Sequence, residues 1–167
     1  NNSAYTHQSG DVNSSMISSN GSNNWAHVDQ YFSYPGRTAS SPSNTSDYNE
    51  SEVNQIGTYN GASVYQRGDF NDADVDQDGY SNYSSNSQYG DDNDIHVDQE
   101  GDDNNSYVYQ SGEDNNAWVD QEGDYNYSYV DQIGDDNFAD VHQDGTSNIS
   151  DVDQWGDDNH ADVHQDG

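Results

Sequence analysis

An eleven-residue pattern recurs along the chain, and this period constrains the fold more than any other feature. From residue 93 to residue 167 it reads Gln-x-Gly-x-x-Asn-x-(Ala/Ser)-x-Val-x-Gln, without an insertion and with one substitution, at Ile95. Self-similarity at a fixed period is typical of solenoids, in which each repeat packs on its neighbours. We therefore expect a stack of repeating units.

The recurring residues of each repeat occupy every second position, which is the period of a β-strand with one specified face. We expect this face to point inward. Its predicted polar side chains, the core ladder, are Asn104, Gln110, Asn115, Gln121, Asn126, Gln132, Asn137, Gln143, Asn148 and Gln154. Between each Gln and the next Asn lie four residues that include Gly, which permits a sharp reversal of the chain. The predicted arc glycines are Gly101, Gly112, Gly123, Gly134, Gly145 and Gly156.

The small inward residue alternates between Ser and Ala from residue 106 to residue 161, so the predicted unit is 22 residues: strand, arc, strand, arc. The predicted fold is all-β, a β-solenoid or cross-β stack with two parallel in-register sheets and strands about 4.8 Å apart. A buried amide is costly unless its donors and acceptors are matched. Identical amides stacked on one another provide that match, as in cross-β zippers.

The N-terminal part of the chain follows the pattern more loosely and contains one interruption. The rhythm from Gln30 to Gln55 implies a three-residue insertion, which we place at residues 31–37, followed by a weak strand at 38–44 that carries Pro42. Asn86 replaces Val and Ile95 replaces Ala in later repeats. Counting every repeat predicts about 15 short strands in a single domain, residues 1–167, with Ala in odd strands and Ser in even strands on both sides of the interruption. Ser51, Ala62 and Ile95 are the exceptions.

Composition taken alone favours disorder, because only 28% of the residues are hydrophobic and 33 acidic residues face two basic ones, a net charge of −31. The strict inward pattern favours an ordered fold instead. The negative charge argues against nucleic acid and anionic membrane surfaces as partners. There is no cysteine and no apolar segment long enough to span a membrane. Since the chain starts within a repeat, we expect a mature secreted product whose leader has been removed.

The repeat resembles the curlin repeat of bacterial curli fibre subunits. The matching positions are Ser106, Gln110, Gly112, Asn115, Ala117 and Gln121, and again Ser128, Gln132, Gly134, Asn137, Ala139 and Gln143. Each Ser stands one strand position from the place that the family uses, which Asn104 and Asn126 fill here. The resemblance implies a secreted functional-amyloid subunit that forms extracellular biofilm fibres, with a nucleator and an outer-membrane export channel as partners. The chain has more repeats and more Asp than the familiar subunit, and no recognisable targeting segment at its N-terminus.

The outward positions suggest an acidic face on one set of strands and a tyrosine-rich face on the other. Stacked carboxylates repel by about 0.9 kcal/mol per neighbour in water, so Ca²⁺ bridging or low pH could promote assembly; alternatively, Asp only solubilises the chain. Asp140 and Asp162 are weak candidate metal ligands. The Asp run at residues 72–78 is not read as an EF-hand, because Ser85 stands where the loop needs Glu. A thin solenoid with a filled interior offers no cleft for catalysis, so an enzyme is not expected.

The predicted function is self-assembly, because a solenoid without caps has unpaired strand edges at both ends. Head-to-tail addition would satisfy those edges and extend the stack into a fibre that serves biofilm matrix and adhesion. The predicted polymer-joint residues are Asn2, Ala4, Gln8, Asn159, Ala161, Val163 and Gln165. The alternative is a monomeric, cation-binding β-solenoid segment of a secreted adhesin. An ice-binding solenoid would need a regular Thr array, and the five Thr residues form no column.

Overall fold

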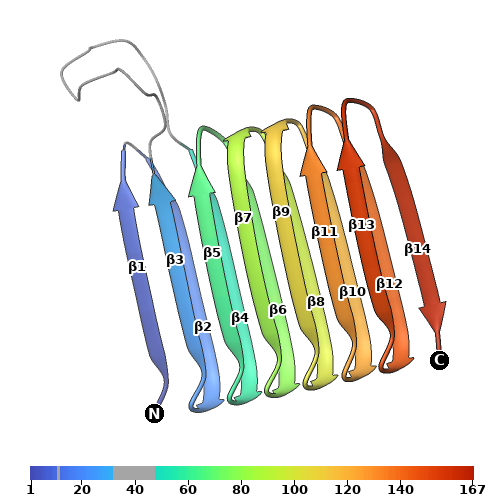
Figure 1. Ribbon diagram of the computed structural model, residues 1–167. Coiled ribbons are helices and arrows are strands. Elements are labelled where there is room, and N and C mark those ends of the chain that lie inside the picture. The colour runs from blue at the N-terminus through green and yellow to red at the C-terminus, as the bar shows by residue number, and fades with distance from the viewer. Residues whose placement is uncertain (11, 32–47) are drawn as a thin grey trace.

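The computed structural model describes residues 1–10, 12–31 and 48–167, which form a β-solenoid (Figure 1). The strands are β1 Ser3–Ser9, β2 Ser14–Ser22, β3 Trp25–Tyr31, β4 Glu50–Thr58, β5 Gly61–Arg67, β6 Asp72–Tyr80, β7 Tyr83–Asp91, β8 Asp94–Asp102, β9 Asn105–Glu113, β10 Asn116–Asp124, β11 Tyr127–Ile133, β12 Phe138–Thr146, β13 Ile149–Trp155 and β14 His160–Asp166. The part of the chain that the structure describes contains no helix, and so none that could cross a bilayer.

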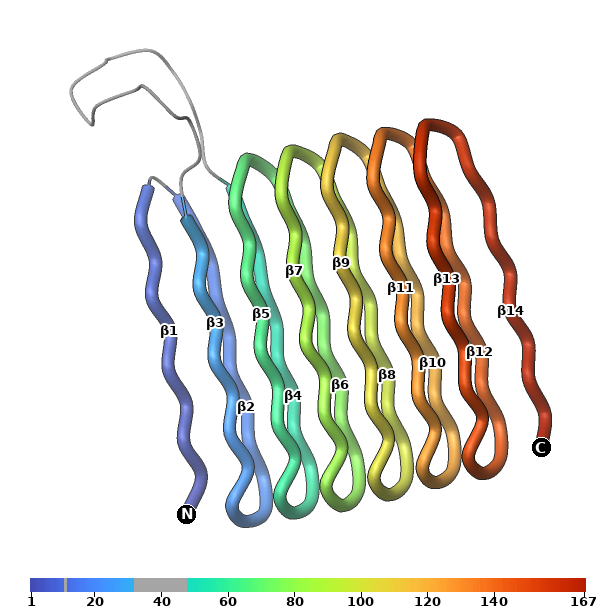
Figure 2. The backbone as a smooth tube through the Cα atoms, in the orientation of Figure 1, coloured from blue at the N-terminus to red at the C-terminus, as the bar shows by residue number. Residues whose placement is uncertain are grey.

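Odd-numbered and even-numbered strands form two separate seven-stranded sheets, which we call sheet A and sheet B. Every pairing is parallel and keeps like positions together, as in Gln110↔Gln132 in sheet A and Gln121↔Gln143 in sheet B. One strand of each sheet and the two arcs beside them make one turn, so the tube in Figure 2 advances by one rung every 22 residues. The predicted fold class is confirmed.

The interruption is resolved differently from the prediction. β2 pairs directly with β4, and β3 pairs directly with β5, so no rung lies between them for another strand. Ladder neighbours Gln30 and Gln66 are consequently 36 residues apart, against 22 residues for Gln66 and Gln88. The described residues contain 14 strands, seven in each sheet, against about 15 predicted for the whole chain. The strand predicted at residues 38–44, with Pro42, lies outside the described residues.

The same pairing overturns the expected distribution of Ala and Ser. Sheet A carries Ala in its first three strands and Ser in its next four, whereas sheet B begins with Ser and then carries Ala or Ile. Ala26 is therefore stacked on Ala62, and Ser15 on Ser51. Ser51 and Ala62, which looked like exceptions, continue the columns of Ser15 and Ala26. Ala and Ser exchange sheets one rung later, where Ser51 is followed by Ala73 in sheet B and Ala62 by Ser84 in sheet A.

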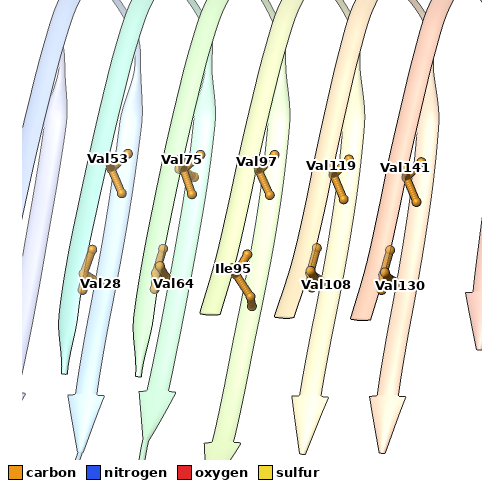
Figure 3. Packing of buried hydrophobic residues seen from close by; sticks show 14 of the residues in the cluster. Val28, Val53, Val64, Val75, Ile95, Val97, Val108, Val119, Val130 and Val141 are labelled. Atoms are coloured by element: carbon orange, nitrogen blue, oxygen red, sulfur yellow. The ribbon is translucent and has the colours of Figure 1, made fainter. Parts of the chain in front are cut away.

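The interior is a narrow seam of small and β-branched side chains between the sheets. Val28, Val64, Val108 and Val130 of sheet A and Val53, Val75, Val97, Val119 and Val141 of sheet B form two rows (Figure 3). Ile95 lies in the row of Val64 and Val108, although it belongs to sheet B. In sheet A the position between those two valines is Asn86, which is buried. The two departures from the repeat therefore adjoin, and the larger Ile stands where a Val is missing.

Candidate functional site: polar ladders with open ends

Glutamine side chains form a continuous hydrogen-bonded ladder in each sheet. In sheet A each Nε2 donates to Oε1 of the next rung at 2.7–3.2 Å, through Gln8, Gln30, Gln66, Gln88, Gln110, Gln132 and Gln154. In sheet B the ladder starts at the Ser19 hydroxyl and runs through Gln55, Gln77, Gln99, Gln121, Gln143 and Gln165. All the amide donors point from the N-terminal rung toward the C-terminal rung, so each ladder has a direction.

The same amides also join the two sheets. Nε2 of Gln110 donates to the backbone oxygen of Asp94 in sheet B at 2.8 Å, and Nε2 of Gln121 donates to that of Asn105 in sheet A at 3.1 Å. Each interior Gln thus uses both amide hydrogens, one along the stack and one across it. This second bond links the sheets where a globular protein would rely on larger apolar side chains.

The asparagines form two columns that use their amides differently. Before the strands of sheet B, Asn115 Nδ2 donates to Asn93 Oδ1 at 3.0 Å, and Asn137 donates in turn to Asn115 at 2.9 Å. In the other column Nδ2 donates to arc backbone instead, as Asn104 does to the oxygen of Gly123 at 2.7 Å. The expected bonding of every amide to its like neighbour therefore holds for both Gln ladders but for only one Asn column.

The structure places the predicted core ladder in the interior. Its Gln and Asn side chains are buried, except that Asn148, near the C-terminal end, is half-buried. The predicted arc glycines Gly101, Gly112, Gly123, Gly134, Gly145 and Gly156 all have φ between 101° and 138°. The residue before each arc Asn also has a positive φ, for example Asp103 at 57°. The sequence signal for this second position was the frequent Asp before Asn.

Close stacking of the arcs also excludes a side chain at the glycines. A Cβ added to Gly134 would lie 2.2 Å from the carbonyl oxygen of Gly156 in the next rung. A Cβ on Gly156 would meet only Nδ2 of Asn159, at 3.9 Å. Gly156 belongs to the last rung of sheet A, where no further arc of the described chain lies above it.

The predicted polymer-joint residues lie in the two end rungs. Asn2, Ala4 and Gln8 are exposed, and Asn159, Ala161, Val163 and Gln165 are half-buried. β1 and β2 end their sheets on one side, and β13 and β14 end them on the other. Within the described residues each of these four strands pairs on one edge only.

The outer faces of the sheets differ in chemistry. Sheet B presents most of the strand carboxylates, in columns such as Asp76, Asp98 and Asp120. Partial burial and the neighbouring carboxylates raise the pKa values of Asp72 and Asp98 above the ordinary value. The hydrogen bond with Asp74 raises the pKa of His96, against an opposing effect of burial. This face is therefore a stack of repelling charges that protonation relieves.

The weak metal candidates do not form a binding cluster. Asp140 lines a shallow depression of about 390 Å³ together with His96, Trp118 and His142, whereas Asp162 lies on the last strand of sheet B. Nδ1 of His142 is 3.0 Å from Oδ2 of Asp120. In residues 1–10, 12–31 and 48–167 no group of three or more His, Asp or Glu side chains is arranged to hold a metal ion.

Sheet A carries aromatic ladders that the strand pattern alone did not reveal. Tyr65, Tyr89 and Tyr109 contact one another in sequence as tilted rings, with centroids 5.3 and 5.5 Å apart. The three rings alternate between two neighbouring columns: Tyr65 and Tyr109 share a column with Ser87 between them, whereas Tyr89 lies in the next column, paired with Ser111. The tyrosine-rich face expected from the sequence, with a small Ser directly beside each ring, was the signal for this contact. Elsewhere on the outer faces, Tyr107 contacts both Tyr83 and Tyr127, and Trp118 contacts Phe138, all as tilted rings.

Comparison with known families supports the reading of the repeat. The family model described as the Curlin associated repeat matches residues 1–31, 47–79, 68–101, 90–123, 112–143 and 134–167. No curated protein and no solved structure matches the chain.

Proposed function

Because this chain belongs to the family of the curlin associated repeat, we propose that it is the structural subunit of an extracellular, curli-like amyloid fibre. Copies add head to tail, each placing its first rung on the last rung of the previous copy. The fibre serves as biofilm matrix and in surface adhesion, and its partners are further copies, a nucleator and an outer-membrane export channel. The subunit has no catalytic role, in keeping with a fold that is a filled stack.

The direction of the glutamine ladders is the observation that carries this proposal. In the described residues the ladder of sheet A starts with Oε1 of Gln8 and ends with Nε2 of Gln154, which donates to the oxygen of Phe138. Interior glutamines use the second hydrogen of that nitrogen for the next rung. One end thus offers an acceptor and the other a donor, so the ends complement each other in only one orientation.

The end rungs also agree in the type of side chain. Extending the register of sheet A by one rung puts the next copy's Ala4, Thr6 and Gln8 on Ser150, Val152 and Gln154. In sheet B the same step puts Ser15, Ile17 and Ser19 on Ala161, Val163 and Gln165. Small residues meet small residues, β-branched residues meet β-branched residues, and hydrogen-bonding groups meet hydrogen-bonding groups. The joint therefore repeats the packing of the interior, which is a heterologous contact that does not close.

Two glycine substitutions distinguish a fibre from a lone solenoid. Gly134→Ala introduces an internal clash with the carbonyl of Gly156, so we expect it to destabilise the monomer. Gly156→Ala has similar backbone strain, with φ values of 101° and 124° at the two positions, but no such clash. At the proposed joint Gly10 of the next copy lies over Gly156, so the clash appears only on assembly.

The experiment measures monomer unfolding in denaturant and seeded growth by light scattering. Gly156→Ala should unfold at a clearly higher denaturant concentration than Gly134→Ala. A Gly156→Ala copy that has joined a seed should nevertheless accept no further copy on its last rung. Added in small amounts to the unsubstituted chain, it should also stop growth, because its first rung can still join a fibre. Growth of Gly156→Ala at the unsubstituted rate would contradict the head-to-tail joint. An unsubstituted chain that stays monomeric with seeds present would favour the adhesin alternative.

A further inference from the structure

The tyrosine ladder of sheet A brings phenol rings from distant parts of the chain into contact. Tyr65 and Tyr89 have ring centroids 5.3 Å apart with planes tilted by 35°, and Tyr89 and Tyr109 have centroids 5.5 Å apart with a tilt of 40°. These separations lie within the range of interacting aromatic pairs. All three residues are half-buried on the outer face of the sheet, so small solutes can reach them.

The backbone holds these rings in place. β5, β7 and β9 are consecutive strands of sheet A, and their register fixes the phenols alternately in two neighbouring columns. Gln66, Gln88 and Gln110, next to the three tyrosines, bond to one another in the buried ladder at 2.9 and 3.2 Å. The tyrosines therefore stay paired in the folded monomer without any contact from a second molecule.

We propose that Tyr65, Tyr89 and Tyr109 form a site for oxidative cross-linking, at which a one-electron oxidant joins neighbouring rungs of one molecule through a dityrosine bond. Each of two adjacent phenols gives one electron to the oxidant and one proton to water. The two phenoxyl radicals then couple by a carbon–carbon bond between positions ortho to oxygen. Each of those carbons then loses its hydrogen as a proton and each oxygen takes up a proton, which restores both phenols. The pair loses two electrons and two protons, and two equivalents of oxidant are reduced.

The environment favours the protonated phenol as the starting state. Burial, with the neighbouring Tyr65 and Tyr109, raises the pKa of Tyr89, while Arg67 acts in the opposite direction. The ring is therefore neutral at physiological pH, and its radical forms by loss of an electron together with a proton. A link between β5 and β7 ties residues 24 positions apart and would hold two rungs together when the hydrogen bonds between them open.

The test oxidises the dilute monomer with light-activated tris(bipyridine)ruthenium(II) and persulfate, which generate a ruthenium(III) one-electron oxidant. Dityrosine fluorescence reports the reaction, and mass spectrometry of protease digests maps the linked peptides. We expect links Tyr65–Tyr89 and Tyr89–Tyr109 within single molecules, and their loss when the same dilute chain is oxidised in denaturant.

Tyr89→Phe keeps the aromatic ring but removes the shared member, so both linked peptides should disappear. Tyr65→Phe should remove the first link and leave Tyr89–Tyr109, which keeps the test decisive if Tyr89→Phe folds poorly by circular dichroism. Tyr125→Phe, at an exposed arc residue, is the matched control and should leave both links intact. Links that join only different molecules, or that persist in equal yield in denaturant, would overturn the proposal. Because the reaction is intramolecular, its outcome does not depend on whether the chain forms fibres.

Discussion

Nε2 of Gln110 donates to Oε1 of Gln132 at 2.9 Å, although the two residues stand a full turn of the solenoid apart in sequence. The same nitrogen donates to the oxygen of Asp94 in the opposite sheet at 2.8 Å, and Oε1 of Gln110 accepts from Gln88 at 3.2 Å. One amide thus connects three rungs and both sheets. Buried polar side chains here do the work that large apolar side chains do in most cores.

Replacing that amide should therefore cost stability. Gln110→Leu leaves Oε1 of Gln132 buried without its donor, and such a group costs about 1–3 kcal/mol. Nε2 of Gln88 loses its bond along the ladder but keeps those to the oxygens of Asp72 and Asn93. We expect the free energy of unfolding of the monomer to fall by about 2 kcal/mol or more, measured in denaturant. Gln165→Leu, at the half-buried end of the other ladder, is the control and should cost clearly less. Equal losses would mean that the interior ladder contributes nothing special.

The buried serines of sheet A differ in hydrogen bonding, which makes opposite predictions for the same substitution. Oγ of Ser128 is buried and has no partner within the described residues, whereas Oγ of Ser84 accepts from Nδ2 of Asn86 at 3.0 Å. Ser128→Ala removes an unsatisfied hydroxyl and should stabilise the monomer by about 1 kcal/mol. Ser84→Ala removes a partner of a buried amide and should destabilise it. Unfolding midpoints in denaturant measure both effects. If the midpoints of the two variants shifted in the same direction, the assigned difference in hydrogen bonding between Ser84 and Ser128 would be wrong.

Asn86 and Ile95 should behave as a coupled pair. Ile95→Ala opens a cavity in the seam, and such a change costs about 2–5 kcal/mol in a packed core. Asn86→Val restores the common residue of that row and fills part of the same space. We expect the double variant to be more stable than the two single effects predict, by on the order of 0.5–3 kcal/mol. The measurement is a double-mutant cycle in denaturant, and simple additivity would show that the two sites do not share space.

Stability should rise as the solution is acidified from neutral pH. Burial, followed by the charges of Asp120 and Asp76, raises the pKa of Asp98, so the folded state binds protons more readily than the unfolded chain. For such a carboxyl the folded state is favoured as pH falls through the raised pKa, above the ordinary 3.8. His96 acts in the same direction, because the hydrogen bond with Asp74 raises its pKa above the ordinary 6.5, and its stabilisation is lost as pH rises through this raised pKa.

Asp98→Asn tests this explanation directly. The variant should be more stable than the unsubstituted chain at about pH 8 and should show a weaker gain on acidification to about pH 5. Unfolding midpoints at several pH values measure both effects. Asp151→Asn, on the outer face of β13 in sheet A, is a charge-matched control that lies outside the acidic columns. An identical pH dependence for all three proteins would refute the role of the stacked carboxylates.

We also propose that divalent cations speed fibre growth by reducing repulsion between carboxylate columns of sheet B. Calcium bridging of surface Asp residues, including Asp140 and Asp162, would act at both the interior rungs and the joint. Light scattering of seeded growth at neutral pH should then slow on addition of EGTA and recover with excess Ca²⁺. Sodium chloride of equal ionic strength separates bridging from screening. A growth rate that EGTA does not change would mean that the surface Asp residues only solubilise the chain.

Much of the fold could be predicted because a buried polar side chain is stable only beside a group that satisfies its hydrogen bonds. A Gln or Asn inside a stack needs a matching group one rung away, so a regular recurrence of amides predicts which strands lie together. The arc glycines could be predicted because Gly permits a sharp reversal, and the structure adds a second reason, since a Cβ at Gly134 would collide with the next rung. The amino-acid sequence by itself thus determined the period, the inward face and the stacking of like on like.

Tertiary contacts decided what periodicity cannot express. Counting repeats across residues 31–49 predicted an extra strand, but pairing of β2 with β4 and β3 with β5 set the phase, because both sheets must keep their ladders continuous. Only the juxtaposition of the sheets shows that Ile95 stands in the row where Asn86 replaces Val, and only the register shows that Tyr65 reaches Tyr89 across a serine. These relationships join positions of different type on different strands, and a repeat pattern records only positions of the same type.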